Sequence, residues 1–492
     1  MANRRRNGYS KPSLPKFRAP SGRTLIIAGA AVAAVALAVL LIVLLSRGGD
    51  DRTAPIVRLE TTESSELAAD NTPAATDTAA EEAVFAEATE GSDDVGESAA
   101  DDTELPSEGE NTAGEAEETV EETLLTLDDV DIPEATVQPS TGNSGKRSVH
   151  FRIAGDIMFH IEQLAQAKKS DGSYDFHSQF RFIADSLANA DYTIANLETT
   201  VGKYKNSSYS GYPQFNTPES CLEALKDCGI DFFTMANNHM LDRWFEGMQQ
   251  DVNLVEKYGF GHVGAYRTKE ERNTPVIVTI NGIKFGFVAY THTTNTMENY
   301  CDDDVFEYGV PFLYKADIKS DIKALRDAGA EVVIALPHWG AEYVYEPDET
   351  QIKYAKKLAK AGADIIIGSH SHMVQKMQVV EGKDSSGQKK QVFLIYSIGN
   401  FISTMTAKRT DGGIILDFTV TEQDDGTFRV ENIGYVPVYV WKMNGKYTVV
   451  PIGKFAKNRP EQMSDSEYSR MLECYNEIKG ILGTNGFTIL PE

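Results

Sequence analysis

Six short polar stretches of this 492-residue chain each follow an apolar run, and together they hold its most chemically versatile side chains. Carboxylates, amides and imidazoles are the groups from which hydrolases build a divalent-metal site. Five of the nine histidines lie in these stretches, and scattered core histidines would not follow the ends of apolar runs so regularly. The stretches are GDIMFH, ANLETT, ANNHMLD, PHWGAEY, GSHSHMVQ and YSIGNF, and the candidate site residues in them are Asp156, Glu198, Asn238, His239, Asp242, His338, His370 and His372.

The stretch GSHSH carries the strongest single signal. In extended backbone, side chains two residues apart point the same way, so the imidazoles of His370 and His372 can face one ion or two adjacent ions. Nitrogen ligands combined with carboxylates suit zinc, manganese or iron. The expected cofactor is therefore a divalent metal, as one or two ions.

The stretch ANNHMLD combines amides with an imidazole directly after the apolar run FFTMA. An amide oxygen from Asn238 and a nitrogen from His239 together suit a transition-type metal. Asp242 stands three residues further on and can hydrogen-bond His239, which would set its tautomer. The structural alternative is an Asx turn that caps the following helix.

The remaining candidates are weaker when each is taken alone. Asp156 offers the oxygen ligand that a hard cation prefers, but a turn-forming aspartate would look the same. In ANLETT either Glu198 or Asn196 can point inward, and the pattern leaves both open. A lone histidine after a strand, such as His338, is more often structural. Asn400 either contacts substrate or fixes a loop.

Alternating strand-like and helix-like segments begin at Ser148. This alternation, followed by a run of strands, predicts a mixed α/β domain with sheets covered by helices. Because ligands bind beyond the carboxyl ends of strands in such sheets, polar stretches far apart in sequence can converge. The expected strands are 149–156, 192–198, 231–238, a 276–291 hairpin, 331–340, 363–372, 391–401, 412–420 and 429–441; the expected helices are 177–190, 218–229, 243–259, 316–329, 349–362 and 465–482.

Charge is distributed unevenly along the chain. The net charge of −26 divides into +7 for residues 1–50, −23 for residues 51–150 and −10 for residues 151–492. The acidity thus belongs mostly to one low-complexity stretch, and 46–147 is expected to be a disordered acidic linker. No basic face is available to offset phosphate repulsion, so nucleic-acid binding is disfavoured.

Residues 25–45 form an uninterrupted apolar run. Its 21 residues match the roughly 20 that cross a membrane as a helix. Residues 1–24 are basic, so the positive-inside rule makes them a cytoplasmic tail and places the C-terminal domain outside the cell. A cleaved signal peptide is the alternative, but its apolar region usually has about 7–15 residues. The expected localisation is therefore the cell membrane, with one spanning helix, and a soluble cytoplasmic phosphatase conflicts with this run.

Four cysteines are too few to predict a disulfide scaffold in a domain of this size. Cys221 and Cys228 lie seven apart in a helical pattern, too distant to bridge. Because the chain has no CxxC pair, metal binding through sulfur is also not expected, and free buried thiols are the prediction.

Taken in order, GD, NLE, NNH, HWGAEY, GSHSH and YSIGNF resemble the bacterial capsule-synthesis CapA family, which is linked to poly-γ-glutamate capsule formation. The resemblance spans residues 148–405. That family is similar to the calcineurin-like metallophosphoesterases, which are four-layer α/β/β/α sandwiches with two metals. The resemblance implies this fold for a domain at 148–442, with 443–492 as its C-terminal extension.

The same resemblance implies roles for individual residues. His239 would be the acid that assists the leaving group. The phosphoesterase pattern has a histidine where this chain has Met158, so one metal position is incomplete unless His160 reaches it. It also has a bridging aspartate where Glu198 or Asn196 stands. The implied ligands are Asn238, His338 and His370 for one metal, and Asp156 and His372 for the other.

The expected function is that of a membrane-anchored, extracytoplasmic protein in capsule or cell-envelope polymer biosynthesis, with a metal-dependent, phosphoesterase-like hydrolase site. Its expected partners are the membrane, an anionic polymer or phosphoester substrate, and a capsule synthesis or export complex. The alternative is a non-catalytic polymer-binding or scaffold protein on the same fold. Catalytic activity itself is left open by the sequence.

Overall fold

The computed structural model describes residues 125, 145–205, 207–303, 305–384, 386–483 and 487–492. The expected basic tail, the membrane-spanning run at 25–45 and nearly all of the acidic linker lie outside these residues. Among the residues that are described, no helix is both long and apolar enough to cross a membrane.

The first sheet has nine strands and is built around β1 (Ser148–Ile157). Apolar side chains of β1 alternate between its two faces, with Val149, Phe151 and Ile153 on one side and Ala154 on the other, so both faces are buried. The strand order is β14 (Lys446–Pro451), β13 (Phe428–Met443), β12 (Gly412–Glu422), β1, β2 (Tyr192–Leu197), β3 (Phe232–Thr234) and β4 (Gly261–Val263), with β11 (Asn400–Ile402) paired to β1 and β15 (Thr488–Ile489) paired to β13.

The second sheet has six strands, and its central strands are parallel and apolar. It begins with the predicted hairpin, in which Asn281 and Gly282 adopt the positive φ angles that a tight turn needs. The strand order is β5 (Val276–Ile280), β6 (Ile283–Thr291), β7 (Val332–His338), β8 (Ile365–Ile367), β10 (Lys389–Ile395) and β9 (Met377–Lys383).

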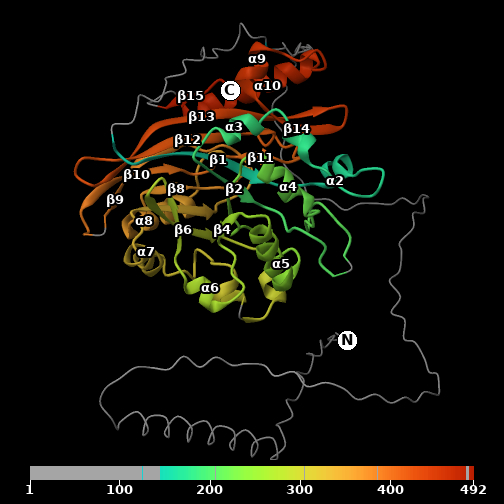
Figure 1. The fold of residues 1–492 in the computed structure, drawn as a ribbon. Coiled ribbons are helices and arrows are strands. Elements are labelled where there is room, and N and C mark those ends of the chain that lie inside the picture. Colours follow the sequence, from blue (N-terminus) through green and yellow to red (C-terminus); the bar gives the residue numbers. More distant parts are fainter. Residues whose placement is uncertain (1–124, 126–144, 206, 304, 385, 484–486) are drawn as a thin grey trace, which may run out of the picture. The chain divides into compact units, whose positions relative to one another are not determined.

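Helices cover the outer faces of both sheets, so the chain is a mixed α/β protein as predicted (Figure 1). One core lies between the sheets, a second lies under α2, α4 and α5, and a third under α7 and α8. Helices α9 and α10 join the inter-sheet core beside β13. The helices are α2 (Ile161–Ala167), η2 (His177–Gln179), α3 (Ala184–Ala188), α4 (Ser220–Asp227), α5 (Trp244–Lys257), α6 (Lys269–Asn273), η3 (Met297–Tyr300), η4 (Val305–Gly309), α7 (Ile318–Asp327), α8 (Glu349–Ala361), α9 (Ile452–Lys457) and α10 (Asp465–Leu482).

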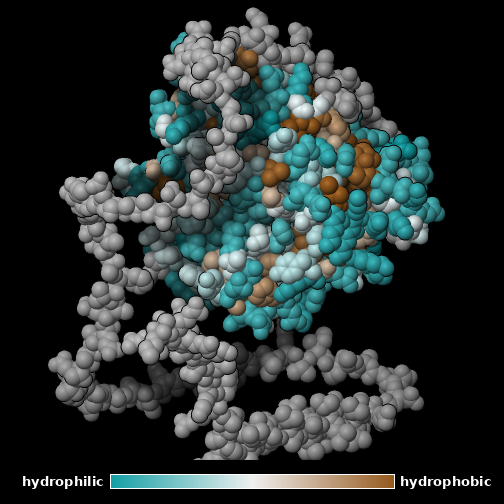
Figure 2. Space-filling model, turned by 180° about the vertical axis from the view of Figure 1, so that it is seen from behind, coloured by the Kyte–Doolittle hydropathy of each residue, from teal (hydrophilic) through white to brown (hydrophobic). Residues whose placement is uncertain are grey.

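Parallel pairing brings two sets of strand ends together. Strands β1, β2 and β3 are parallel in the first sheet, and β6, β7 and β8 are parallel in the second. The carboxyl ends of all these strands except β6 lead into polar stretches found in the sequence. The reverse face of the molecule is mostly hydrophilic, with hydrophobic residues in separate groups (Figure 2).

Some predicted elements differ from the structure. The helix expected at 177–190 consists of two short pieces, η2 and α3, and no side chain caps the start of α3. The strand expected at 231–238 ends at Thr234, because the chain then turns to carry its polar residues to the sheet edge. The strand expected at 391–401 is divided between β10 and β11. The elements that were not predicted are the helices α2, α6, η3, η4 and α9 and the strands β4, β9, β14 and β15. All four cysteines are free, as expected, and three of them are buried: Cys221, Cys228 and Cys474.

Candidate metal centre

The candidate ligands from distant stretches lie together at the strand ends of both sheets. Asp156 belongs to β1, Glu198 follows β2, and His338 is the last residue of β7. His370 and His372 come from the turn after β8. All five side chains belong to buried residues, the most exposed at 4%.

Glu198, His338 and His370 form one group of potential ligands. One donor atom from each lies within 4.8 Å of the others. His338 Nε2 is 3.5 Å from Glu198 Oε1 and 3.0 Å from His370 Nδ1. The amide oxygen Oδ1 of Asn238 is 2.8 Å from the same His338 Nε2, so Asn238 also borders this group.

Asp156, Glu198 and His372 form a second group, again within 4.8 Å. His372 Nδ1 is 3.3 Å from Asp156 Oδ2, and His372 Nε2 is 3.9 Å from Glu198 Oε1. Glu198 therefore belongs to both groups and stands between them. A carboxylate shared by two adjacent ligand sets is suited to bridge two cations.

The sequence left open whether Asn196 or Glu198 points into the site, and the structure gives the two residues different roles. The amide Nδ2 of Asn196 donates to Asp156 Oδ1 at 2.8 Å and to Glu198 Oε2 at 3.2 Å. Asn196 thus orients both carboxylates as a hydrogen-bond donor, and Glu198 is the residue at the centre of the ligand sets.

Burial strongly affects the ionisable groups here. Desolvation, together with the charge of Asp156, raises the pKa of Glu198 well above its usual value. Desolvation also lowers the pKa values of His338 and His370 well below the usual value, with the neighbouring histidines adding to the effect. Neutral imidazoles are the form that binds metal.

A divalent cation fits the donor set. Glu198 Oε1 is buried and has no hydrogen-bond partner among the described residues. An orphaned buried oxygen of this kind is costly unless a cation or donor reaches it. Carboxylate oxygens with imidazole nitrogens and one amide oxygen match zinc, manganese or iron chemistry.

His239 and Asp242 form a buried pair beside the ligand groups. His239 Nδ1 is 2.8 Å from Asp242 Oδ2, which also accepts the backbone N–H of Phe215 at 2.7 Å. This contact leaves His239 Nε2 as the atom that gives or takes a proton. Burial raises the pKa of Asp242, while its hydrogen bond to His239 opposes that change.

His370 and His372 lie in a turn and not in the extended strand that was predicted over 363–372. Strand β8 ends at Ile367, and both histidines have positive φ, 98° and 59°. The imidazoles therefore converge through a tight turn and not through the alternation of an extended strand. Gly368 permits this turn, since a Cβ there would lie 2.0 Å from the carbonyl oxygen of Tyr396.

Two polar residues that the predicted site did not include hold the imidazoles in place. Ser369 Oγ lies 2.8 Å from His338 Nδ1, and Asn400 Oδ1 lies 3.0 Å from His372 Nδ1. Asn400 is brought there by β11, which pairs with β1 at Asp156. Ser369 lies in the polar stretch GSHSHMVQ and Asn400 in YSIGNF, but only the fold shows which imidazole each one contacts.

Met158 and His160 do not complete the second ligand group. Met158 is buried, at 1% exposure. His160 belongs to neither group of ligands, and its ring packs edge-on against Phe215 at 5.2 Å. Burial lowers the pKa of His160 to about 4, and its Nε2 has no hydrogen-bond partner among the described residues.

Exposed tyrosines border the groups on the solvent side. The Tyr212 ring is 6.4 Å from the His239 ring, and the Tyr343 ring is 6.1 Å from the His372 ring. Burial and the adjacent Glu342 raise the pKa of Tyr343 to about 12, so its hydroxyl stays a donor. Glu342 Oε1 is 4.0 Å from His372 Nε2.

The family described as "Bacterial capsule synthesis protein PGA_cap" matches residues 150–405, which include every residue of both ligand groups. This chain belongs to that family. The resemblance inferred from the sequence motifs is thereby confirmed.

Individual relatives are distant in sequence. The PGA biosynthesis protein CapA of Bacillus subtilis is 25% identical over 287 residues, which are 57% of this chain and 70% of that protein. The capsule biosynthesis protein CapA of Bacillus anthracis is 26% identical over 282 residues, 56% of this chain and 64% of that protein. A probable polyglutamine synthesis accessory protein of Mycobacterium tuberculosis is 24% identical over 204 residues, 39% of this chain and 53% of that protein.

Two solved structures are also similar. The NAD nucleotidase NadN of Haemophilus influenzae has a TM-score of 0.37 at 12% identity, covering 70% of this chain and 64% of that chain. The calcineurin-like phosphoesterase YfkN of Bacillus subtilis has a TM-score of 0.37 at 13% identity, covering 68% of this chain and 99% of that chain. These scores are too low to assign a fold, so the description above rests on the sheets and cores of the chain itself.

Proposed function

We propose that this capsule-synthesis family member is a metal-dependent hydrolase that acts in the biosynthesis of an anionic envelope polymer of the poly-γ-glutamate type. The observation that supports this most directly concerns Glu198, which is buried and shared by two ligand groups. No described residue hydrogen-bonds its Oε1. The names of the relatives supply the polymer class.

Six residues would hold the metal: Asn238, His338 and His370 on one side, Asp156 and His372 on the other, and Glu198 between them. Asn196 would orient both carboxylates as a hydrogen-bond donor. A bound divalent cation would polarise the electrophilic centre of the substrate and acidify the attacking water. The positive charge of the cation would also favour the ionised form of Glu198, which burial disfavours.

His239 would supply the proton that the leaving group needs. Its Nδ1 contacts Asp242, which leaves Nε2 to donate to the departing oxygen or nitrogen as the bond breaks. Asp242 would act as a positioning residue, since its hydrogen bond to Phe215 N–H holds it in place. Tyr212 and Glu342 lie near the same groups and would contact the substrate around the reacting bond.

A second candidate function is polymer binding without cleavage, as part of a capsule assembly or export complex. Met158 favours this alternative, because a thioether stands where phosphoesterases of this motif pattern have a ligating histidine. Its side chain is buried and His160 does not replace it in either ligand group. In this case the metal would serve to hold polymer carboxylates.

The membrane anchor and extracellular location also belong to the proposal. Their support is the apolar run at 25–45 with its basic flank. Anchoring there would keep the domain near the site where an exported polymer emerges.

The decisive experiment measures metal content and hydrolysis on the same full-length protein. We expect bound metal together with turnover of poly-γ-glutamate or of a phosphodiester, lost on chelation and restored by manganese or zinc. Bound metal with polymer binding but no turnover would favour the second candidate. A protein that binds neither metal nor polymer would contradict both.

A further inference from the structure

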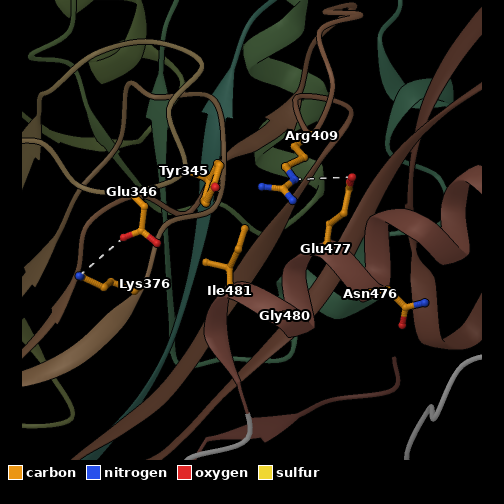
Figure 3. A pocket seen from close by; sticks show the side chains of 8 residues that line it. All are labelled: Tyr345, Glu346, Lys376, Arg409, Asn476, Glu477, Gly480 and Ile481. Carbon is orange, nitrogen blue, oxygen red and sulfur yellow. Dashed lines mark ion pairs between the residues drawn. The ribbon is translucent and has the colours of Figure 1, made fainter. Parts of the chain in front are cut away.

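A cavity of about 570 Å³ lies between helix α10 and the loop that follows β7 (Figure 3). Tyr345, Glu346 and Lys376 line one side, while Arg409 and the α10 segment 476–481 line the other. Arg409 and the α10 segment lie outside the residues that the family matches. None of the ligand residues lines this cavity, so it is separate from the candidate metal centre.

Among the described residues, the guanidinium of Arg409 makes one ion pair, a long one with Glu477 (Figure 3). Its Nε is buried without a hydrogen-bond partner among the described residues, and the nearest carboxylate oxygen, Glu477 Oε1, is 3.6 Å away. Glu477 Oε2 accepts a hydrogen bond from Arg470 at 3.0 Å, so the charge of this acid is already offset. Arg409 therefore retains capacity for an incoming anion.

Each side of the cavity carries one cation, Arg409 on the α10 side and Lys376 on the opposite side. The Arg409 guanidinium lies over the ring of Tyr345, 4.5 Å from its centroid, a favourable cation–π contact (Figure 3). Lys376 Nζ is 3.8 Å from Glu346 Oε2, beyond hydrogen-bond distance, and its side chain is 45% exposed. A planar guanidinium and a half-exposed ammonium together suit the carboxylate groups of an extended chain.

The cavity is connected to the candidate metal centre through a short loop. Glu342 lies beside His372, and Tyr345, three residues later, lines the cavity. Three residues span at most about 11 Å between Cα atoms. Tyr343, Val344 and Tyr345 are consecutive and exposed, at 47%, 38% and 47%, so an apolar strip joins the two places.

This connecting loop is held in a defined position. The backbone N–H of Tyr343 donates to the carbonyl of Ser371, in the turn between His370 and His372, at 2.9 Å. Gln375 Nε2 donates to the carbonyl of Val344 at 2.8 Å. The strip is thus ordered by the same turn that presents the imidazoles.

We propose that the cavity is a subsite for a carboxylate-bearing polymer strand that also occupies the metal centre. The strand crosses the strip formed by Tyr343, Val344 and Tyr345 and places carboxylates on Arg409 and Lys376. This inference rests on the proposed function and adds to it that the protein binds an extended strand over several units, rather than a single terminal unit.

Binding affinity as a function of ligand length tests the subsite. In the metal-loaded full-length protein, the double variant Arg409→Ala/Lys376→Ala should lose roughly tenfold in affinity for long poly-γ-glutamate, the scale of one or two charged hydrogen bonds. Its affinity for a γ-glutamyl dipeptide and its metal content should not change. Arg409→Lys should restore part of the loss, and Lys389→Ala, at an exposed cation on β10, serves as the matched control.

Each outcome has a separate meaning. If the wild type binds the polymer but the double variant binds it equally well, the subsite is wrong and the proposed function stands. The subsite would also be wrong if the double variant lost the same factor in affinity for the dipeptide and for the long polymer. It would likewise be wrong if the loss of affinity grew with ligand length for polyphosphate but not for poly-γ-glutamate. If the wild type binds no polymer, the proposed function fails together with the inference.

Discussion

The two oxygens of Glu198 have different environments. Oε2 accepts a hydrogen bond from Asn196, whereas Oε1 faces His338 and His372 without a hydrogen-bond partner among the described residues. A purely structural glutamate in such a buried place would be expected to have both oxygens satisfied. One oxygen held by a hydrogen bond and one free to face two ligand groups is the arrangement that a bridging carboxylate requires.

Glu198→Gln should weaken metal binding in both groups at once. A neutral amide removes the shared negative charge while keeping the shape of the side chain. The loss of affinity should be at least roughly 10–100-fold, which is the effect of removing even an outer partner of a metal ligand. Elemental analysis and metal titration measure it, with Glu223→Gln, an exposed acid of α4, as the control. Unchanged metal content in Glu198→Gln would contradict the bridging role.

His239→Gln should affect turnover according to the leaving group. Loss of a general acid costs roughly 10²–10⁴-fold in rate where the leaving group needs a proton. Activated p-nitrophenyl substrates need none, so their rates should change little, and metal content should stay constant. A uniform loss for both kinds of substrate would argue that His239 has a structural role or binds metal.

At the level of elements, the turn after β8 is where backbone geometry determines the chemistry. Trp339 Nε1 donates to the carbonyl of Tyr396 at 2.9 Å, and Gly368 lies directly against both groups. The turn then places His370 and His372 with positive φ angles. Strand ends bring the ligands near one another, but this packed turn sets the direction of two imidazoles.

Gly368→Ala should destabilise the protein by roughly 1–3 kcal/mol, the usual scale of overpacking in a close-packed region. Its Cβ would lie 2.0 Å from the Tyr396 carbonyl oxygen and 2.4 Å from Trp339 Nε1. Chemical denaturation measures the free energy of unfolding. Gly480→Ala in α10 is the contrast, because no atom of the described residues lies within 4 Å of the added Cβ, and it should raise stability by about 0.5–1 kcal/mol. Equal effects at both positions would refute the packing argument.

At the level of the whole molecule, Arg147 joins the two sheets. Its guanidinium pairs with Glu422 of β12 and with Glu331, which precedes β7, each at 2.8 Å. Because the candidate metal centre takes ligands from both sheets, their relative position affects its geometry. Outside the described residues, the proposed membrane anchor would set where the whole domain acts.

Arg147→Ala should lower the midpoint of thermal unfolding slightly, and the difference from wild type should shrink as salt is added. The side chains of Arg147, Glu331 and Glu422 are partly exposed, at 27–35%, and ion pairs near the surface contribute little individually and are screened by salt. Thermal scans at low and high ionic strength measure this, with Lys389→Ala as the control. A difference that is independent of salt would indicate that Arg147 acts through packing.

Full-length protein should remain in the membrane fraction after an alkaline wash, and protease added to intact cells should release its C-terminal domain. The reason is the 21-residue apolar run with basic residues before it. Deletion of 25–45 should move the protein to the soluble fraction. Recovery of the unaltered chain in the soluble fraction would contradict the anchor.

The sequence alone determined the class of fold, the family and the identity of the chemical groups. Apolar runs that end in polar residues identify strand ends, and parallel strand ends meet at one edge, so residues as distant as Asp156 and His372 were expected to lie together. Only the tertiary structure decided how they meet. Period-two alternation says nothing about a turn with positive φ, so the geometry of His370 could not be foreseen.

The same limit applies to roles that depend on contacts between elements. Asn196 and Glu198 are two residues apart in one stretch, and which of them donates and which is shared follows from where Asp156, His338 and His372 lie around them. The cavity beside α10 brings together residues from 345 to 481. Sequence specifies which side chains are available, but hydrogen bonds and cavities depend on distances in space, and the packing of the two sheets and their helices sets those distances.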